Sequence, residues 1–283
     1  MFANKSITVL TRALGAAALF AAVGVAQASV VSIPNTTLQA SPGKYTANGY
    51  YTNNLGANIV TTGGGAGANV GRADGRNDDG YMALDLGFNV TFFGQTYSSL
   101  FINNNGSVSF GDGVAEYRPN GVTGADAPII SPFFGDVDTR NPDSGVVHYN
   151  LAQNQLVVTW DNVGYYSAHG DKTDSFQLVL RGDGYVPVAG EGLIGFFYGN
   201  MGWDTTDTSK FAAVGFGNGN GDGQTIDGSL VPGVNNIVQN KYIWFDAKLD
   251  TVPPAAVPEP SALALTMIGL LGAGLSARRK RKA

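Results

Sequence analysis

The stretch LFINNNGSVSF, residues 100–110, decides which fold this chain is expected to adopt. Apolar and β-favouring residues occupy its two ends, and Asn105-Gly106 stands between them. An Asn-Gly pair between two such runs is the strongest short-range signal for a β-hairpin. The stretch therefore predicts two antiparallel strands joined by a tight turn.

The same pattern continues on both sides of this hairpin. Apolar and polar residues alternate over residues 88–92 and again over 176–180, and a turn at 152–155 separates apolar runs at 146–150 and 156–163. Outside the two ends of the chain, no window repeats with the 3.6-residue period of a helix. Short strands about ten residues apart are typical of all-β folds. We expect an antiparallel sandwich or barrel of many short strands.

The composition excludes several functional classes. The 283 residues include no Cys and 2 His. Disulfide scaffolds, thiolate zinc sites, iron–sulfur clusters and Cys nucleophiles are therefore excluded, as is a His-rich metal site. Hydrophobic residues make up 43% of the chain, which is too many for an intrinsically disordered protein.

The N-terminus has the three parts of a secretory signal peptide. Lys5 and Arg12 supply positive charge, residues 14–25 are apolar, and Ala26-Gln27-Ala28 forms an A-x-A cleavage site. We therefore predict that residues 1–28 are a signal helix, removed on export.

The C-terminus also combines an apolar run with basic residues, but in the reverse order. Pro258-Glu259-Pro260 precedes an uncharged run at 261–277, which is followed by five basic residues at 278–282. Seventeen apolar residues are the lower limit for crossing a bilayer, and the basic end would stay in the cytoplasm. We expect residues 251–260 to be a Pro-rich spacer and residues 261–283 to be a single-span helix with a basic tail.

This arrangement resembles the PEP-CTERM sorting signal of Gram-negative bacteria, with Pro258, Glu259 and Pro260 as its core. The resemblance implies processing by a membrane protease, an exosortase. It also implies transient anchoring in the inner membrane and delivery to the cell surface or to an extracellular polymer layer.

The charge of the part between the two ends is strongly negative. The signal carries 2 of the 17 Lys+Arg, and the tail carries 5 of them and 1 of the 22 Asp+Glu, so residues 29–256 hold 10 and 21. The net charge of the whole chain, −5, argues against a nucleic-acid partner, and residues 29–256 alone carry a net charge of −11. We expect residues 29–79 to form an irregular or loosely β leader and residues 80–250 to form the β domain.

Five motifs in this β domain carry a second resemblance. In chain order they are FFGQTY at 92–97, LFINNNG at 100–106, ISPFFGDVDTR at 130–140, VVTWDNVGYY at 157–166 and SFQLVL at 175–180. Together they resemble the nidogen-like (NIDO) domain of extracellular matrix and adhesive cell-surface proteins, over roughly residues 80–228. The resemblance implies an extracellular, non-catalytic adhesion or matrix module.

Acidic residues suggest a calcium site. Asp136 and Asp138 share one face if their segment is extended, and Asp143 follows five residues later. Oxygen ligands at such spacing suit Ca²⁺. The alternative is that Asp138 caps the loop while Asp136 pairs with Arg140. Two other acidic segments, residues 77–80 and 218–227, are interpreted either as turns or as partial ion sites.

Three aromatic residues are candidate ligand contacts. Tyr165 and Tyr166 are adjacent, so a strand would turn one outward. Trp203 lies on a predicted loop, where its ring could stack on a sugar.

No catalytic motif is recognisable, and His148 and His169 have no context that favours a triad. We therefore expect no enzyme. The favoured function is an exported adhesion or structural module of a biofilm or other extracellular matrix, with polysaccharide or matrix proteins as partners. A lectin-like carbohydrate-binding domain is the alternative, and a polysaccharide hydrolase is the third.

Overall fold

The fold is described from a computed structural model, which covers residues 29–41, 45–61, 64–65, 73–117, 119–205 and 210–246. The predicted signal helix and C-terminal helix lie outside these residues. Within the described part of the chain, the helices are all too short or too polar to span a membrane.

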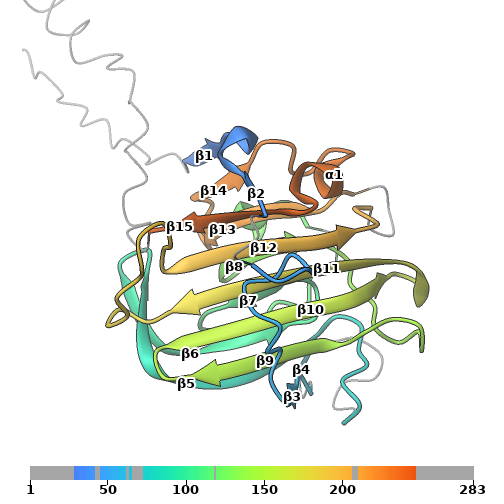
Figure 1. Cartoon of the computed structure of the whole chain (residues 1–283), viewed down its shortest axis with the longest axis horizontal. Coiled ribbons are helices and arrows are strands. Elements are labelled where there is room, and N and C mark those ends of the chain that lie inside the picture. Colours follow the sequence, from blue (N-terminus) through green and yellow to red (C-terminus); the bar gives the residue numbers. More distant parts are fainter. Residues whose placement is uncertain are drawn as a thin grey trace, which may run out of the picture.

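Two sheets face each other across the core, as in a sandwich (Figure 1). The eight-stranded sheet has the order β1 (Val30–Ile33), β14 (Gly223–Ile226), β13 (Ala213–Asn218), β8 (Pro128–Phe134), β7 (Ser107–Ser109), β6 (Gln95–Asn103), β5 (Gly80–Phe92) and β4 (Gly64–Gly65). The seven-stranded sheet has the order β2 (Gln39–Ala40), β15 (Lys241–Phe245), β12 (Ile194–Met201), β11 (His169–Arg181), β10 (Gln155–Tyr165), β9 (Val147–Ala152) and β3 (Asn58–Ile59). The short helical turns are η1 (Asn35–Thr37), η2 (Val122–Gly124) and α1 (Val234–Val238).

The prediction of an antiparallel all-β fold is confirmed, and of the two architectures the chain adopts the sandwich. Neighbouring strands are antiparallel except β1, which pairs with β14 in parallel. Each sheet keeps two edge strands, so neither closes on itself.

The predicted hairpin at residues 100–110 is formed by β6 and β7. Ile102 pairs with Val108, and Asn103 pairs with Ser107. Gly106 has a φ of +78°, which the turn requires and which glycine adopts most readily. A Cβ atom at this position would lie 1.8 Å from the carbonyl oxygen of Phe133 in β8. The turn is therefore shaped both by its own backbone and by the strand beside it.

The main core lies between the two sheets. Ile102 and Ile130 enter it from the eight-stranded sheet, and Trp160 and Phe176 enter it from the seven-stranded sheet, all fully buried. The rings of Trp160 and Phe176 stack with centroids 5.0 Å apart. Large buried side chains of this kind each contribute about 3–5 kcal/mol, judged by their truncation to Ala. The core thus stabilises a domain that has no disulfide.

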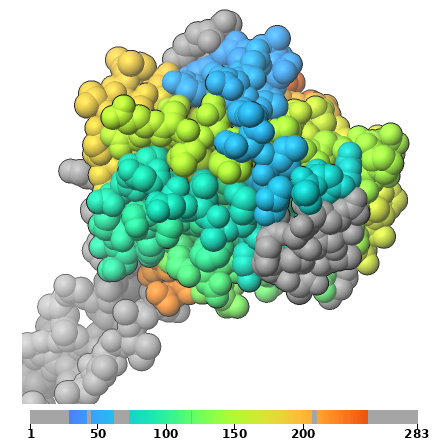
Figure 2. All heavy atoms as spheres, turned by 90° about the horizontal axis from the view of Figure 1, so that it is seen from below, coloured from blue at the N-terminus to red at the C-terminus, as the bar shows by residue number. Residues whose placement is uncertain are grey.

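The segment that precedes β5 is more closely integrated than the sequence suggested. It supplies β1 to β4, which pair with both sheets. Tyr45 packs on Phe197 and Tyr242, with ring centroids 5.0 and 4.7 Å away, so it covers the outer face of the seven-stranded sheet. Figure 2 shows the described part of the segment before β5, in blue, crossing the surface of the molecule. The described part of the predicted leader is therefore a cover for the sheet.

A buried arginine links the segment before β5 to the seven-stranded sheet. The guanidinium of Arg181 in β11 lies 2.7 Å from the carboxylate of Glu191 and donates to the hydroxyl of Tyr51 at 2.9 Å. It also lies 4.4 Å from the ring centroid of Trp244. An arginine without solvent exposure needs such partners, because unpaired buried charge is costly.

Candidate functional site

Three segments that the sequence analysis singled out meet in space. They are the NDDG run at 77–80, the NNNG turn at 103–106 and the GDVDTR run at 135–140. The amide of Asn104 donates to the carbonyl of Val137, and the backbone N–H of Thr139 donates to the carbonyl of Asn77 at 2.9 Å. These bonds hold the three loops together.

Carboxylates converge where these loops meet. One oxygen from each of Asp78, Asp79 and Asp136 lies within 4.8 Å of the others. Asp136 is fully buried and Asp78 is 6% exposed, while Asp79 is half-buried. The amide nitrogen of Asn105 donates to the carboxylate of Asp79 at 2.8 Å. The group is therefore enclosed by protein on most sides.

Arg140 sits beside this group and neutralises part of its charge. Its guanidinium pairs with both oxygens of Asp138 and lies 2.7 Å from the carboxylate of Asp78. Burial raises the pKa of Asp78 to about 7, the neighbouring Asp79 and Asp138 add to the rise, and Arg140 opposes it. Among the described residues, the guanidinium of Arg140 thus offsets charge on Asp78 and Asp138.

Of the three predicted calcium ligands, Asp136 belongs to the converging group, whereas Asp138 and Asp143 do not. Asp138 already accepts hydrogen bonds from Arg140 and from the backbone N–H of Ala168, at 2.7 Å for the latter. Asp143 is exposed, in the turn after Pro142. Asp136 instead joins Asp78 and Asp79. The reason is that the segment bends where the backbone N–H of Val137 donates a hydrogen bond to the carbonyl of Gly135 at 3.1 Å. The prediction took this segment as extended.

The alternative interpretation of these residues is correct in part. Asp138 does bind the loop through backbone N–H groups, but the ion pairs of Arg140 run to Asp138 and Asp78. In the 218–223 segment, Asn218 accepts hydrogen bonds from the backbone N–H groups of Asn220 and Asp222, at 2.8 and 3.0 Å. That segment forms a turn, which is the first of its two interpretations.

The expectation that Trp203 offers an open stacking face is wrong. The residue is 5% exposed, its indole N–H donates to the carbonyl of Val163 at 3.1 Å, and its ring packs against Phe133. Polar neighbours in the sequence suggested a loop aromatic, whereas contacts with distant strands bury it.

Tyr165 and Tyr166 lie at the tip of the β10–β11 hairpin. Tyr166 is 43% exposed. Tyr165 is half-buried, stacks on His169 with centroids 4.6 Å apart, and donates from its hydroxyl to Asp171 at 3.1 Å. Tyr165 is thus held in a fixed orientation.

A hollow of about 410 Å³ opens beside Tyr165, and Trp203 contributes to its wall. Charged and amide side chains line it as well: Lys172 in β11, Asp204 after β12, and Asn235 and Asn236 in α1. Sequence reasoning missed these four residues, because only the folded chain brings their segments together.

A buried carboxyl group supports one wall of this hollow. Asp174 in β11 accepts hydrogen bonds from the backbone N–H groups of Gly202 and Trp203, at 2.6 and 3.0 Å. Burial raises the pKa of Asp174 well above its usual value, and the nearby Asp204 adds to the rise. The carboxyl group therefore fixes the position of the segment that forms the wall.

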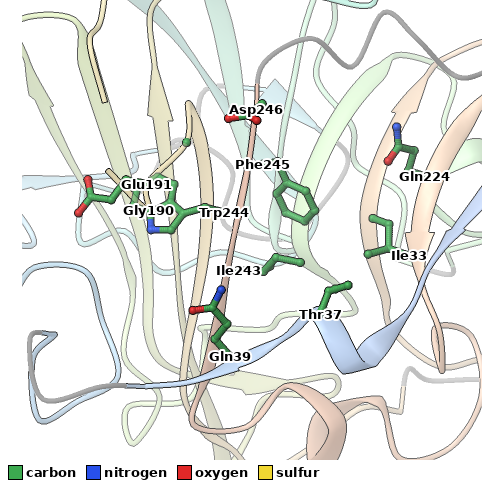
Figure 3. Close-up of a pocket in the computed structure, with 11 residues that line it drawn as sticks. Ile33, Thr37, Gln39, Gly190, Glu191, Gln224, Ile243, Trp244, Phe245 and Asp246 are labelled. Carbon is green, nitrogen blue, oxygen red and sulfur yellow. The ribbon is translucent and has the colours of Figure 1, made fainter. Parts of the chain in front are cut away.

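A second, larger groove of about 630 Å³ lies at the edge of the sandwich. Figure 3 shows Ile243 and Phe245 on one side of β15, facing Ile33, and Trp244 on the other side. This groove runs between β15 and the edge strand β1 and adjoins Asp246, where the described part of the chain ends. Its walls combine apolar side chains such as Ile243 and Phe245 with polar ones such as Gln39 and Gln224.

Two protein families match this chain. A family model described as NIDO related matches residues 45–245, and the model of the PEP-CTERM protein-sorting motif matches residues 256–281. Because the first match spans most of its length, the chain belongs to the NIDO-related family. The match begins at residue 45, within the segment that covers the seven-stranded sheet. The sorting motif implies exosortase processing and export from a Gram-negative bacterium to the cell surface.

Animal proteins are among its relatives. Alpha-tectorin of Gallus gallus is 27% identical over 205 residues, which cover 59% of this chain and 9% of that protein. Nidogen of Drosophila melanogaster is 28% identical over 131 residues, which cover 37% of this chain and 10% of that protein. The chain thus matches about a tenth of the length of these relatives. No solved structure matches it.

Proposed function

We propose that this protein is a non-catalytic adhesion or matrix module that binds extracellular polymer at the surface of the exporting cell. The observation that carries the proposal is the union, in one chain, of a NIDO-related sandwich with a C-terminal sorting motif. Sorting delivers the folded part to the outside of the cell, where its surface meets polymer and neighbouring cells. Loops on a rigid β scaffold are well suited to such binding.

The hollow beside Tyr165 favours a polysaccharide as the polymer, and hence the lectin-like version of this function. An aromatic ring offers an apolar face, while the amides of Asn235 and Asn236 and the carboxylate of Asp204 offer hydrogen bonds to hydroxyl groups. The acidic net charge of the exported part disfavours polyanions at low salt. A neutral or cationic polysaccharide fits this hollow best.

Binding to purified polymer tests the proposal. We expect the full-length protein to co-sediment with the extracellular polysaccharide of the producing bacterium. We expect Tyr165→Ala to weaken binding about two- to tenfold, since an aromatic contact contributes about 0.5–1.5 kcal/mol. Tyr166→Ala is the matched control, because Tyr166 is the exposed neighbour that does not line the hollow.

Three outcomes separate the possible functions. Absence of binding by the parent protein to any polymer fraction would remove the polysaccharide version. Equal binding by the parent and by Tyr165→Ala would place the contact elsewhere on the surface. New reducing ends in the polymer, absent with heat-inactivated protein, would indicate a hydrolase and contradict the non-catalytic proposal.

A further inference from the structure

The start of β1 and the turn between β13 and β14 form a site for an amino group. We propose that a signal peptidase cleaves the chain after Ala28, and that the carboxylate of Asp222 binds the ammonium group of the new N-terminal residue, Ser29. This site shares no residue with the hollow at Tyr165 and does not depend on polymer binding.

The position of Ser29 is the first observation. Its backbone nitrogen lies 2.6 Å from Oδ1 of Asp222, although the two residues are 193 positions apart in the chain. Its carbonyl oxygen accepts a hydrogen bond from the backbone N–H of Gly223 at 3.0 Å. The A-x-A motif predicts Ser29 as the first residue of the mature chain. The backbone of this residue is thus fixed beside a carboxylate.

The carboxylate of Asp222 is oriented independently of Ser29. Its second oxygen, Oδ2, accepts a hydrogen bond from the side-chain amide of Asn218 at 2.9 Å. The backbone N–H of Asn218 donates to the carbonyl of Asp222, also at 2.9 Å, and closes the turn. Asp222 is half-buried. A carboxylate held in this way loses little side-chain freedom when it pairs with a cation.

The other end of β1 is held as well. β1 lies beside β14 and pairs with it in parallel (Figure 1). The hydroxyl of Ser32 donates to the carboxylate of Asp227, and the backbone N–H of Asp227 donates to the carbonyl of Ile33 at 2.9 Å. The side chain of Ile33 is 9% exposed and belongs to the main core. β1 is therefore a docked edge strand, which keeps its first nitrogen next to Asp222.

Cleavage changes the chemistry of the Ser29 nitrogen. Hydrolysis of the peptide bond between Ala28 and Ser29 consumes one water molecule. The oxygen of this water joins the carbonyl carbon of Ala28 to give a carboxylate, and its two protons pass to the nitrogen of Ser29 to give an ammonium group. An α-amino group is mostly protonated at pH 7. The neutral hydrogen bond to Asp222 thus becomes a charge-assisted one, and such bonds are about twice as strong.

The charges around the turn favour this pairing. Residues 211–240 include β13, β14 and the turn between them, and they contain Asp222 and Asp227 but no Lys, Arg or His. In the described part of the chain, Asp222 forms no ion pair with a side chain. The mature chain therefore gains an ion pair that the precursor lacks, at the edge of the eight-stranded sheet.

Acetylation of the α-amino group tests the site on the mature protein purified from the producing bacterium. Mass spectrometry first identifies the N-terminal residue, which we expect to be Ser29. At about pH 6.5, acetic anhydride modifies α-amino groups ahead of lysines, because their pKa is lower. Acetylation restores a neutral amide, as in the precursor. We expect it to lower the Tm of the parent protein by about 2–4 °C.

Two variants separate the ion pair from other effects of acetylation. Asp222→Asn keeps an oxygen that can accept from Ser29 but removes the charge, so acetylation should leave its Tm unchanged. Asp227→Asn is the matched control, because Asp227 binds Ser32 at the other end of β1. Acetylation should lower the Tm of this control as much as that of the parent.

The rate of acetylation gives a second measurement that needs no substitution. An ammonium group bound to a carboxylate holds its proton more tightly, so the folded parent should react about three- to tenfold more slowly than the protein in urea. Three results would overturn the proposal. They are a mature chain that begins at another residue, an equal fall in Tm for the parent and Asp222→Asn, and equal rates for the folded and unfolded parent.

Discussion

Asp174 illustrates how a single buried residue links the fold to the hollow. One of its carboxyl oxygens accepts two backbone hydrogen bonds, while the other has no donor among the described residues. Ionising such a group places an uncompensated charge in the interior, close to Asp204. The folded protein therefore holds the proton on Asp174 at pH values where the unfolded chain has lost it.

This proton predicts a pH dependence of stability. Because the pKa of Asp174 is raised by folding, its contribution is complete below about pH 3.8 and is lost as the pH rises through the raised pKa. Asp78, with a pKa of about 7, acts in the same direction. Asp174→Asn keeps the accepting oxygen but cannot ionise, so its free energy of unfolding should fall less steeply with pH than that of the parent.

Urea unfolding in calcium-free buffer across about pH 4 to 8 measures this difference. Asp143→Asn is the control, because Asp143 is exposed. Identical pH profiles for the parent and Asp174→Asn would show that the buried carboxyl group is not the origin of the slope.

Among the elements, the β6–β7 turn is the one that the sequence specifies most strongly. Gly106→Ala would combine a left-handed backbone with a Cβ atom 1.8 Å from the carbonyl oxygen of Phe133. We expect it to lower the free energy of unfolding by about 3 kcal/mol or more, since each of these effects costs about 1–3 kcal/mol.

Gly94→Ala provides the matched control for this element. Gly94 has a similar φ of +73°, but nothing lies within 4 Å of its added Cβ atom. Gly94→Ala should lower the free energy of unfolding only by the cost of the left-handed backbone, about 1–2 kcal/mol. Equal losses in the two variants, measured by urea unfolding, would mean that β8 gives way and that the close approach to Phe133 is unimportant.

Local pattern was sufficient to predict the hairpins but not the contacts between sheets. The runs that form β6, β7, β9 and β10 are recognisable because alternation and turn residues act between neighbours in sequence. The burial of Trp203 depends on Phe133 and Val163, which belong to other strands. Asp136 likewise meets Asp78 and Asp79 only through the fold. These pairings were not visible in the sequence.

The packing of the segment before β5 was also not predicted from the sequence. Glycines and weak strand signals made residues 29–79 look like a loose leader, yet Tyr45 packs on the aromatic side chains of β12 and β15. Tyr45 and Tyr51 stand among polar residues, and the segment shows no periodic pattern. Their packing on Phe197 and Trp244 becomes apparent only once the sheet is assembled.

For the whole molecule, we propose that the signal and sorting motifs direct export and that the acidic sandwich between them meets the surroundings. The negative charge expected for the exported part would favour contact with neutral or cationic polymer. In this account the function resides in surface contacts between the sandwich and material outside the cell.

Aggregation of living cells tests this account most directly. Sedimentation and biofilm mass would be compared for the producing bacterium, a deletion strain, and deletion strains that express either the parent protein or Tyr165→Ala, with surface amounts matched by immunodetection. We predict that deletion reduces both measures, that the parent protein restores them, and that Tyr165→Ala does not. Unchanged sedimentation and biofilm mass in the deletion strain would contradict the adhesion function.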